Sequence, residues 1–244
     1  MNQLAYYVLS AFAVLITLTV HEYFHGYFAY KLGDPTARNC GRLTLNPIKH
    51  IDPIGALCMV FFHIGWAKPV PVNSRYLKKP RRDLALISLA GPLSNLVMAF
   101  ISALVVLILN AVFSSISFGS EFLLSAAKNT VTFFLIFHTV NIGIAIFNLI
   151  PIPPLDGSKI LGVILPPKMF FSYMRHERTL YYVLLGWLLL GNIASDFLLS
   201  IPAIYSSPVL SVIATLISLS NILGYAIGAI SDLMMNFWQL IPFL

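Results

Sequence analysis

The chain has 244 residues, of which 58% are hydrophobic and only 10% are charged. Soluble domains carry roughly 25% charged residues, so this composition excludes an ordinary soluble protein and indicates an integral membrane protein. The net charge of +6 does not indicate nucleic-acid binding, because ten of the fifteen Lys and Arg residues lie between Lys31 and Arg82, beside apolar segments. Basic loops of this kind are typical of the cytoplasmic face of a membrane protein. We therefore expect a lipid bilayer, and no nucleic acid, as partner.

The first apolar segment runs from Leu4 to Val20 and predicts a membrane-spanning helix that continues to about Leu32. No Lys or Arg precedes Lys31. The segment therefore lacks the positive start of a cleaved signal peptide, and we expect it to remain in the mature protein. The basic residues after it predict a cytoplasmic far end and an amino terminus outside.

An HExxH pattern, from His21 through Glu22 to His25, lies near the predicted cytoplasmic end of this first helix. Residues i and i+4 of a helix share one face, so the two imidazoles can reach one metal ion. Zinc accepts such nitrogen ligands, and Glu22 beside them is a candidate general base. The alternative interpretation is a structural polar cluster between packed helices.

The region between the first and second spans is too interrupted to cross the membrane. Gly41 to Asn46 alternates polar and apolar residues, which predicts a short strand. Ile54 to Ile64 is apolar but only eleven residues long, which predicts a re-entrant or peripheral segment. Prolines within Trp66 to Val72 predict extended backbone. The basic cluster from Arg75 to Arg82 is expected to contact lipid headgroups.

The remaining apolar segments predict further spans. Gly91-Pro92-Leu93-Ser94-Asn95 predicts a local kink in the second span, with a buried amide at Asn95. In the last segment we expect a break near Asn221 or Gly224. The predicted spans are Leu84 to Phe113, Thr130 to Leu149, Thr179 to Ile201 and Val209 to about Gln239. The predicted fold is an all-α polytopic membrane bundle of about five to six spans, with a short β or re-entrant region between the first and second full spans.

A proline-rich break, Pro151 to Gly157, follows the third full span and cannot continue as regular helix. The charge pattern brings this break to the same membrane face as His21. Asp156 is the only acidic residue in the break, and catalytic zinc sites use three protein ligands and one open position. Asp156 is therefore the natural third ligand, and the alternative is a simple Asp-Gly turn.

Three motifs in this order resemble those of the site-2 protease family of intramembrane zinc metalloproteases. The motifs are HEYFH, GPLSN and NLIPIPPLDG, and the stretches GDPTARNCGRLTLNPIKHIDPIG and GWAKPVPV resemble the compact prokaryotic branch, without PDZ or CBS modules. The resemblance implies one zinc ion per chain, bound by His21, His25 and Asp156. It also implies that Glu22 is the catalytic base and that Asn95 has a supporting role near the substrate or the developing oxyanion.

The expected function is an intramembrane zinc endopeptidase that hydrolyses peptide bonds within or near transmembrane segments of membrane-protein substrates. We expect one domain over residues 1–244, with a catalytic core over about 4–160 and C-terminal helices over 179–240. The predicted location is the prokaryotic cytoplasmic membrane, with the active site toward the cytoplasm. The predicted strand at Arg42 to Leu45 could hold an unwound substrate as a neighbouring strand.

Two other functions are weaker alternatives. A catalytically silent scaffold that binds transmembrane proteins would not need the base Glu22. A transporter is disfavoured because no inverted repeat is visible and the polar groups gather at one end. The sequence does not decide whether the protein forms a homo-oligomer. It also leaves the role of Asp196, in the fourth full span, undecided. Lone histidines are more often structural residues than metal ligands, so we expect His63 and His138 to be structural. We expect Asn148 to brace the end of its helix rather than to contact substrate.

Overall fold

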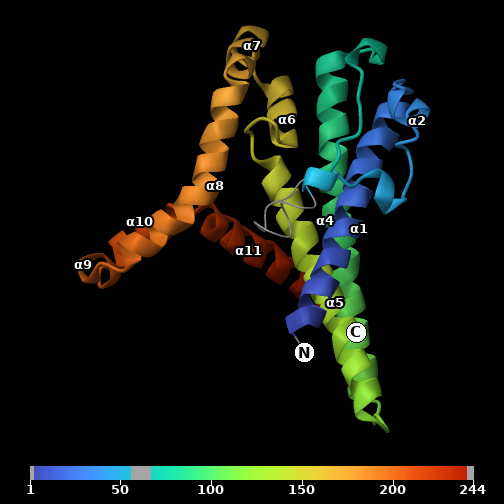
Figure 1. Cartoon of the computed structure of the whole chain (residues 1–244), viewed down its shortest axis with the longest axis vertical. Coiled ribbons are helices and arrows are strands. Elements are labelled where there is room, and N and C mark those ends of the chain that lie inside the picture. Colours follow the sequence, from blue (N-terminus) through green and yellow to red (C-terminus); the bar gives the residue numbers. More distant parts are fainter. Residues whose placement is uncertain (1–2, 56–66, 241–244) are drawn as a thin grey trace.

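The computed structural model describes residues 3–55 and 67–240, and this part of the chain is largely helical. Helices α1 (Gln3–Lys31), α4 (Pro80–Ser114) and α5 (Glu121–Leu149) pack side by side as a bundle (Figure 1). The apolar segment predicted over Ile54 to Ile64 lies almost wholly outside the described residues.

The prediction of an all-α polytopic membrane protein is confirmed. Four helices of the described chain are long and apolar enough to cross a membrane, namely α1, α4, α5 and α8 (Glu177–Leu199). A further pair, α10 (Pro208–Leu216) and α11 (Leu219–Gln239), is bent by 98° and passes the same test as one broken span. The described residues thus contain four candidate spans, or five with the bent pair, compared with the five to six predicted.

Small side chains line the interior of the bundle, and large apolar ones cover its outside. This distribution suits a lipid environment, because apolar side chains gain nothing by leaving lipid while small ones let helix backbones approach closely. The fully buried small residues include Ala13, Ala29, Ala99, Ala103 and Ala145. The exposed large residues include Phe12, Val97, Ile101, Ile108 and Leu135.

The connection from α1 to α4 folds back over the end of α1. It contains α2 (Thr36–Asn39) and two short 3-10 turns, η1 (Pro47–Lys49) and η2 (Ser74–Tyr76). The fully buried carboxylate of Asp34 holds it in place, since Oδ2 accepts a 2.6 Å hydrogen bond from the backbone N–H of Asn73. The extended backbone predicted over Trp66 to Val72 stays a prediction: Ala67 forms an isolated antiparallel bridge with Ile51, and residues 68–72 form no helix or turn.

The prediction of a strand over Gly41–Asn46 is wrong. These residues form turns and bends. Their backbone groups are used locally, since the N–H of Arg42 donates to the carbonyl of Ala37 at 2.8 Å. The Thr44 carbonyl accepts from the His50 ring, also at 2.8 Å. A strand needs these groups for a ladder, so the alternating pattern is not realised as β structure.

Two short helices follow α5 at the same end of the bundle, α6 (Asp156–Ile164) and α7 (Pro167–Arg175). Arg81, in the first turn of α4, fixes the end of α6. Its Nε donates to the carbonyl of Gly162 at 3.0 Å, and its Nη2 donates to that of Leu165 at 2.6 Å. We predicted that the basic cluster contacts lipid headgroups, but Arg81 instead binds carbonyls at the end of α6. These carbonyls have no partner within that helix.

Helices α8 and α10, with the short α9 (Pro202–Tyr205) between them, form an arm that diverges from the bundle (Figure 1). Helix α11 returns to the bundle, where His138 of α5 meets it. One ring nitrogen of His138 donates to the Ala99 carbonyl, and the other pairs with the Ser231 hydroxyl, each at 2.9 Å. His138 is thus a structural residue between helices.

The break between the last two helices lies earlier than predicted. It falls between Leu216 and Leu219, not near Asn221 or Gly224. Trp187 of α8 donates to the Ile217 carbonyl at 2.7 Å, which secures the bend. The Ser218 side chain then caps the start of α11. A serine at the N-cap is favourable there because its oxygen accepts from an otherwise unpaired N–H.

Candidate metal centre

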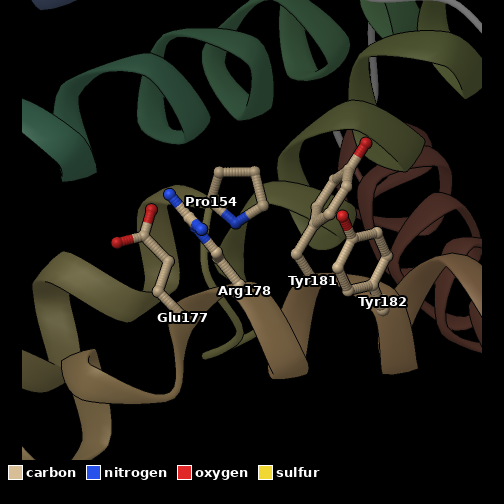
Figure 2. Close-up of a pocket in the computed structure, with 5 residues that line it drawn as sticks. All are labelled: Pro154, Glu177, Arg178, Tyr181 and Tyr182. Carbon is tan, nitrogen blue, oxygen red and sulfur yellow. The ribbon is translucent and has the colours of Figure 1, made fainter.

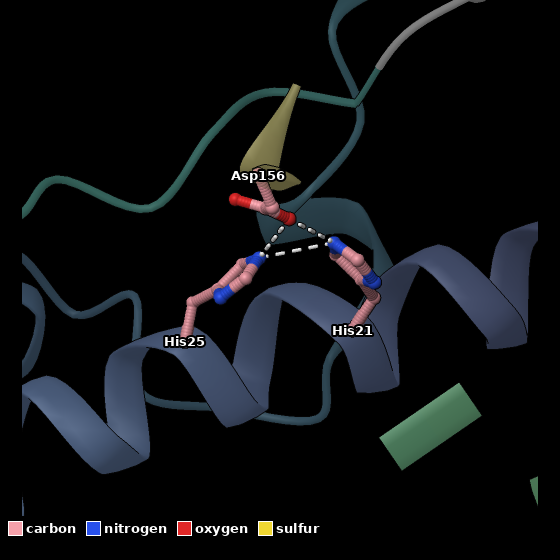
Figure 3. A group of neighbouring side chains, drawn as sticks. All are labelled: His21, His25 and Asp156. Carbon is pink, nitrogen blue, oxygen red and sulfur yellow. Dashed lines mark hydrogen bonds and ion pairs between the residues drawn. The ribbon is translucent and has the colours of Figure 1, made fainter. Parts of the chain in front are cut away.

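His21, His25 and Asp156 meet at the end of the bundle that carries α2, α6 and α7 (Figure 3). The two Nε2 atoms lie 3.0 Å apart. Oδ2 of Asp156 lies 3.2 Å from Nε2 of His21 and 3.1 Å from Nε2 of His25. All three side chains are buried. The helix spacing places both imidazoles on one face of α1, and the chain break after α5 brings the carboxylate to them.

Asp156 is the first residue of α6, and its carboxylate is held in the ionised form. Burial opposes ionisation, but the close contacts with His21 and His25 and the ammonium of Lys159 outweigh that penalty. The pKa of Asp156 therefore lies well below the usual range of an aspartate. Lys159 is 3.5 Å from Oδ1, so Oδ2 is the oxygen that faces the histidines.

The next residue, Gly157, allows this placement. A Cβ at that position would meet the backbone carbonyls of Leu149 and Ile150, which cannot move aside as a flexible side chain would. The Asp-Gly pair at the start of α6 thus serves close backbone packing, and it leaves the Asp156 side chain directed at the histidines.

Each histidine is also held through its second ring nitrogen. Nδ1 of His25 lies 2.7 Å from the Ile87 carbonyl of α4. A carbonyl only accepts, so neutral His25 carries its proton on Nδ1 and presents a lone pair at Nε2. Nδ1 of His21 lies 3.2 Å from Nδ2 of Asn95, on the same helix α4. The buried amide predicted at Asn95 is therefore present, and its polar contact is a candidate ligand.

Gly91 of α4 makes room for both imidazole rings. A Cβ at Gly91 would lie 2.5 Å from Cε1 of His25 and 2.7 Å from Cε1 of His21. Such distances do not occur between real side chains, so α4 can approach the pair only with glycine here. The GPLSN motif contains this residue, but sequence reasoning used only its Pro and Asn.

Replacing Gly91 with alanine is therefore expected to weaken zinc binding by roughly tenfold or more, comparable to losing an outer-shell partner of a metal site. The rings must shift by more than the ~0.2 Å that ligand geometry tolerates. Zinc affinity by chelator competition measures the effect. Gly186→Ala is the matched control, because nothing lies within 4 Å of a Cβ at that helical position. Equal affinity in Gly91→Ala and wild type would contradict the expectation.

Glu22 lies beside the cluster, on the next position of α1 after His21. Its Oε2 accepts a 2.8 Å hydrogen bond from the backbone N–H of Val70. Val70 lies in the connection before η2 and stands between Pro69 and Pro71, neither of which has an N–H. The Val70 N–H is thus the one amide of this tripeptide that can orient the Glu22 carboxylate, and sequence reasoning did not find it.

Other candidate residues do not join the cluster. His138 lies in the α4–α5–α11 contact, and His63 lies outside the described residues. The amide of Asn148 donates to the Ile144 carbonyl at 3.0 Å, one turn back on α5, as expected for a residue that braces its helix end. Asp196 is exposed on α8.

A separate pocket of about 360 Å³ lies beside the proline-rich break (Figure 2). Pro154 lines it from the break, and the first turns of α8 supply the other side chains: Glu177, Arg178, Tyr181 and Tyr182. None of the cluster residues lines this pocket.

The donor set fits a zinc ion. Two imidazole nitrogens and one carboxylate oxygen are common zinc ligands. Zinc–ligand distances of about 2.0–2.2 Å put two ligands of one tetrahedral ion roughly 3.3 Å apart. The separations of 3.0, 3.1 and 3.2 Å are close to that value. This group is one that could hold a metal ion.

Two histidines and an aspartate gathered within a helical membrane bundle define a candidate metal centre of a membrane-embedded protein. The model of peptidase family M50 matches residues 9–191. The chain belongs to this family, the site-2 protease family, and the predicted resemblance is confirmed.

Named relatives agree with the family. A Bacillus subtilis protein named "Putative zinc metalloprotease YwhC" is 42% identical over 172 residues, which cover 68% of this chain and 76% of that protein. "Putative zinc metalloprotease Rip2" of Mycolicibacterium smegmatis is 31% identical over 168 residues, or 63% of this chain and 56% of that protein. No solved structure matches the chain.

Proposed function

We propose that this protein is an intramembrane zinc endopeptidase that hydrolyses peptide bonds within or near transmembrane segments of other membrane proteins. Membership of the family supports a metallopeptidase in the bilayer with membrane-protein substrates. The observation that carries the proposal is the convergence of three ligand atoms, 3.0–3.2 Å apart, beside Glu22 on a spanning helix.

In this proposal His21, His25 and Asp156 hold one zinc ion per chain. Bound zinc supplies Lewis-acid activation of water and of a peptide carbonyl. Glu22 accepts the proton of the attacking water and then delivers it to the leaving amine, so that one carboxylate serves as base and as acid. The Val70 N–H holds Oε2, which leaves Oε1 as the proposed proton acceptor.

The substrate must lose helical structure before it is cut, because a helix hides its carbonyl oxygens and N–H groups in i to i−4 hydrogen bonds. We propose a catalytic core over about residues 4–160 within one domain of the whole chain. We also propose the prokaryotic cytoplasmic membrane as location, with the amino terminus outside. Basic residues gathered in the connections at the metal-centre end support a cytoplasmic orientation of the site.

Removal of zinc from the full chain tests the proposal. The purified protein is expected to contain one zinc per chain and to cleave a single-span substrate at a bond within or next to its apolar segment. A chelator should abolish cleavage, and added zinc should restore it. Cleavage that survives zinc removal would contradict the metal mechanism. A cut mapped by mass spectrometry to a distant soluble loop would contradict intramembrane proteolysis.

A further inference from the structure

The side-chain amide of Asn95 contacts a candidate ligand from behind. Asn95 is fully buried on α4, and its Nδ2 lies 3.2 Å from Nδ1 of His21. The opposite nitrogen of that ring, Nε2, faces Asp156 and His25. Oδ1 of Asn95 is buried and has no hydrogen-bond partner among the described residues. A buried carbonyl oxygen without a donor is costly, so the amide has a reason to change its orientation.

The orientation of this amide decides which nitrogen of His21 carries the proton. With Nδ2 donating to Nδ1, neutral His21 has its proton on Nε2. That proton can be donated to Asp156, 3.2 Å away, but it occupies the lone pair that a metal needs. With the amide turned end for end, Oδ1 accepts from Nδ1–H, and Nε2 is free to bind zinc. The two ends of an amide have nearly the same shape, so the turn displaces no neighbour.

His25 shows the arrangement that a ligand requires. The Ile87 carbonyl accepts from its Nδ1, so its Nε2 is available. A metal-binding histidine normally donates its other N–H to an oxygen in this way. In the part of the chain that the structure describes, the group next to Nδ1 of His21 is the Asn95 amide, so its oxygen is the matching acceptor.

Asn141 provides a contrast. It is also fully buried and contacts α1, but its Nδ2 donates to the Phe137 carbonyl at 2.8 Å and to the Thr17 hydroxyl at 3.0 Å. The Phe137 carbonyl only accepts, so the Asn141 amide cannot turn without losing this bond. Among the described residues, Asn95 has no such constraint, because its amide contacts the His21 ring, and the two residues form a matched pair for experiment.

We propose that Asn95 is a positioning residue that keeps the proton of His21 on Nδ1 when zinc binds, and so releases Nε2 for the metal. The inference rests on the proposed zinc centre. Without metal, Nε2–H of His21 donates to Asp156 and the Asn95 amide donates to Nδ1. Loading the metal requires the proton to leave Nε2 and the amide to turn. Asn95 thus acts through a ligand, not on the substrate or the oxyanion.

Zinc affinity of three variants tests this role. Asn95→Leu keeps the size but removes the acceptor, so zinc should bind about 10–100-fold more weakly. Asn95→Asp offers only acceptors, so zinc should bind at least as tightly as in the wild type. Asn141→Leu, the control, should stay close to the wild type. Chelator competition measures the affinities, and the visible spectrum of the cobalt-substituted protein reports the ligand geometry.

Several outcomes overturn the inference. If Asn95→Leu binds zinc as tightly as the wild type, the inference is wrong. If that variant has also lost cleavage, Asn95 acts on the substrate instead. Weaker zinc binding in Asn95→Asp than in the wild type also contradicts the inference, because a hydrogen-bond acceptor would then not be what His21 needs. This outcome can be read even if Asn95→Leu fails to fold. A wild-type protein that binds no zinc contradicts the proposed metal centre itself, which separates the two failures.

Discussion

Glu22→Gln is expected to lower kcat for cleavage by at least ~10²–10⁴-fold, the contribution typical of general acid–base catalysis. Glutamine has the shape of glutamate and keeps an oxygen for the Val70 N–H, so the local backbone should not move. It cannot take a proton from the attacking water. The zinc content should therefore equal that of the wild type, because Glu22 is not one of the proposed ligands.

The experiment compares cleavage of one labelled single-span substrate by wild type and variant at equal zinc loading. Glu177→Gln is the control, because Glu177 lies at the start of α8 and outside the cluster. Full activity in Glu22→Gln would contradict the assignment of the base. Loss of zinc together with activity would mean that Glu22 supports the metal instead.

Asp156→Ala is expected to abolish stable zinc binding and cleavage. The variant removes one of three proposed ligands and the only carboxylate among them. The loss of zinc affinity should exceed the ~100-fold that removal of an outer-shell partner costs. The substitution also removes the anion that lies between Lys159 and the two buried histidines, whose Nε2 atoms are 3.0 Å apart.

Zinc content after dialysis against a chelator-buffered solution measures this effect. Asp196→Asn on α8 is the control, since that carboxylate is exposed and away from the cluster. Asp156→Ala that retains one zinc per chain would contradict the assignment of the third ligand. A circular dichroism spectrum equal to that of wild type separates loss of metal from loss of fold.

Local patterns were sufficient for the helices and for the candidate ligands. Runs of apolar residues predicted α1, α4, α5 and α8 because crossing a membrane needs a length of helix that a sequence displays directly. The i, i+4 spacing of His21 and His25 specifies a shared helix face. Asp156 could be found because it is an acid in a proline-rich break at a predictable membrane face.

Contacts between distant segments could not be predicted in this way. The alternation at Gly41–Asn46 suggested a strand, but the side chain of His50 and the carbonyl of Ala37 take up the backbone groups that a ladder would need. The bend before α11 is set by the hydrogen bond from Trp187 on another helix. Both outcomes depend on partners that lie elsewhere in the fold.

The sequence by itself determined that this protein is a helical membrane protein with the motifs of the site-2 protease family, because hydropathy and motif spacing are local properties. Only the tertiary structure decided how the centre is supported. Gly91 admits the two rings, the Ile87 carbonyl and the Asn95 amide contact the histidines from behind, and the Val70 N–H orients Glu22. These roles come from backbone groups, a missing Cβ and an amide orientation. The GPLSN motif contains Gly91 and Asn95, but the contacts that give these residues and the backbone groups their roles exist only when the segments pack together.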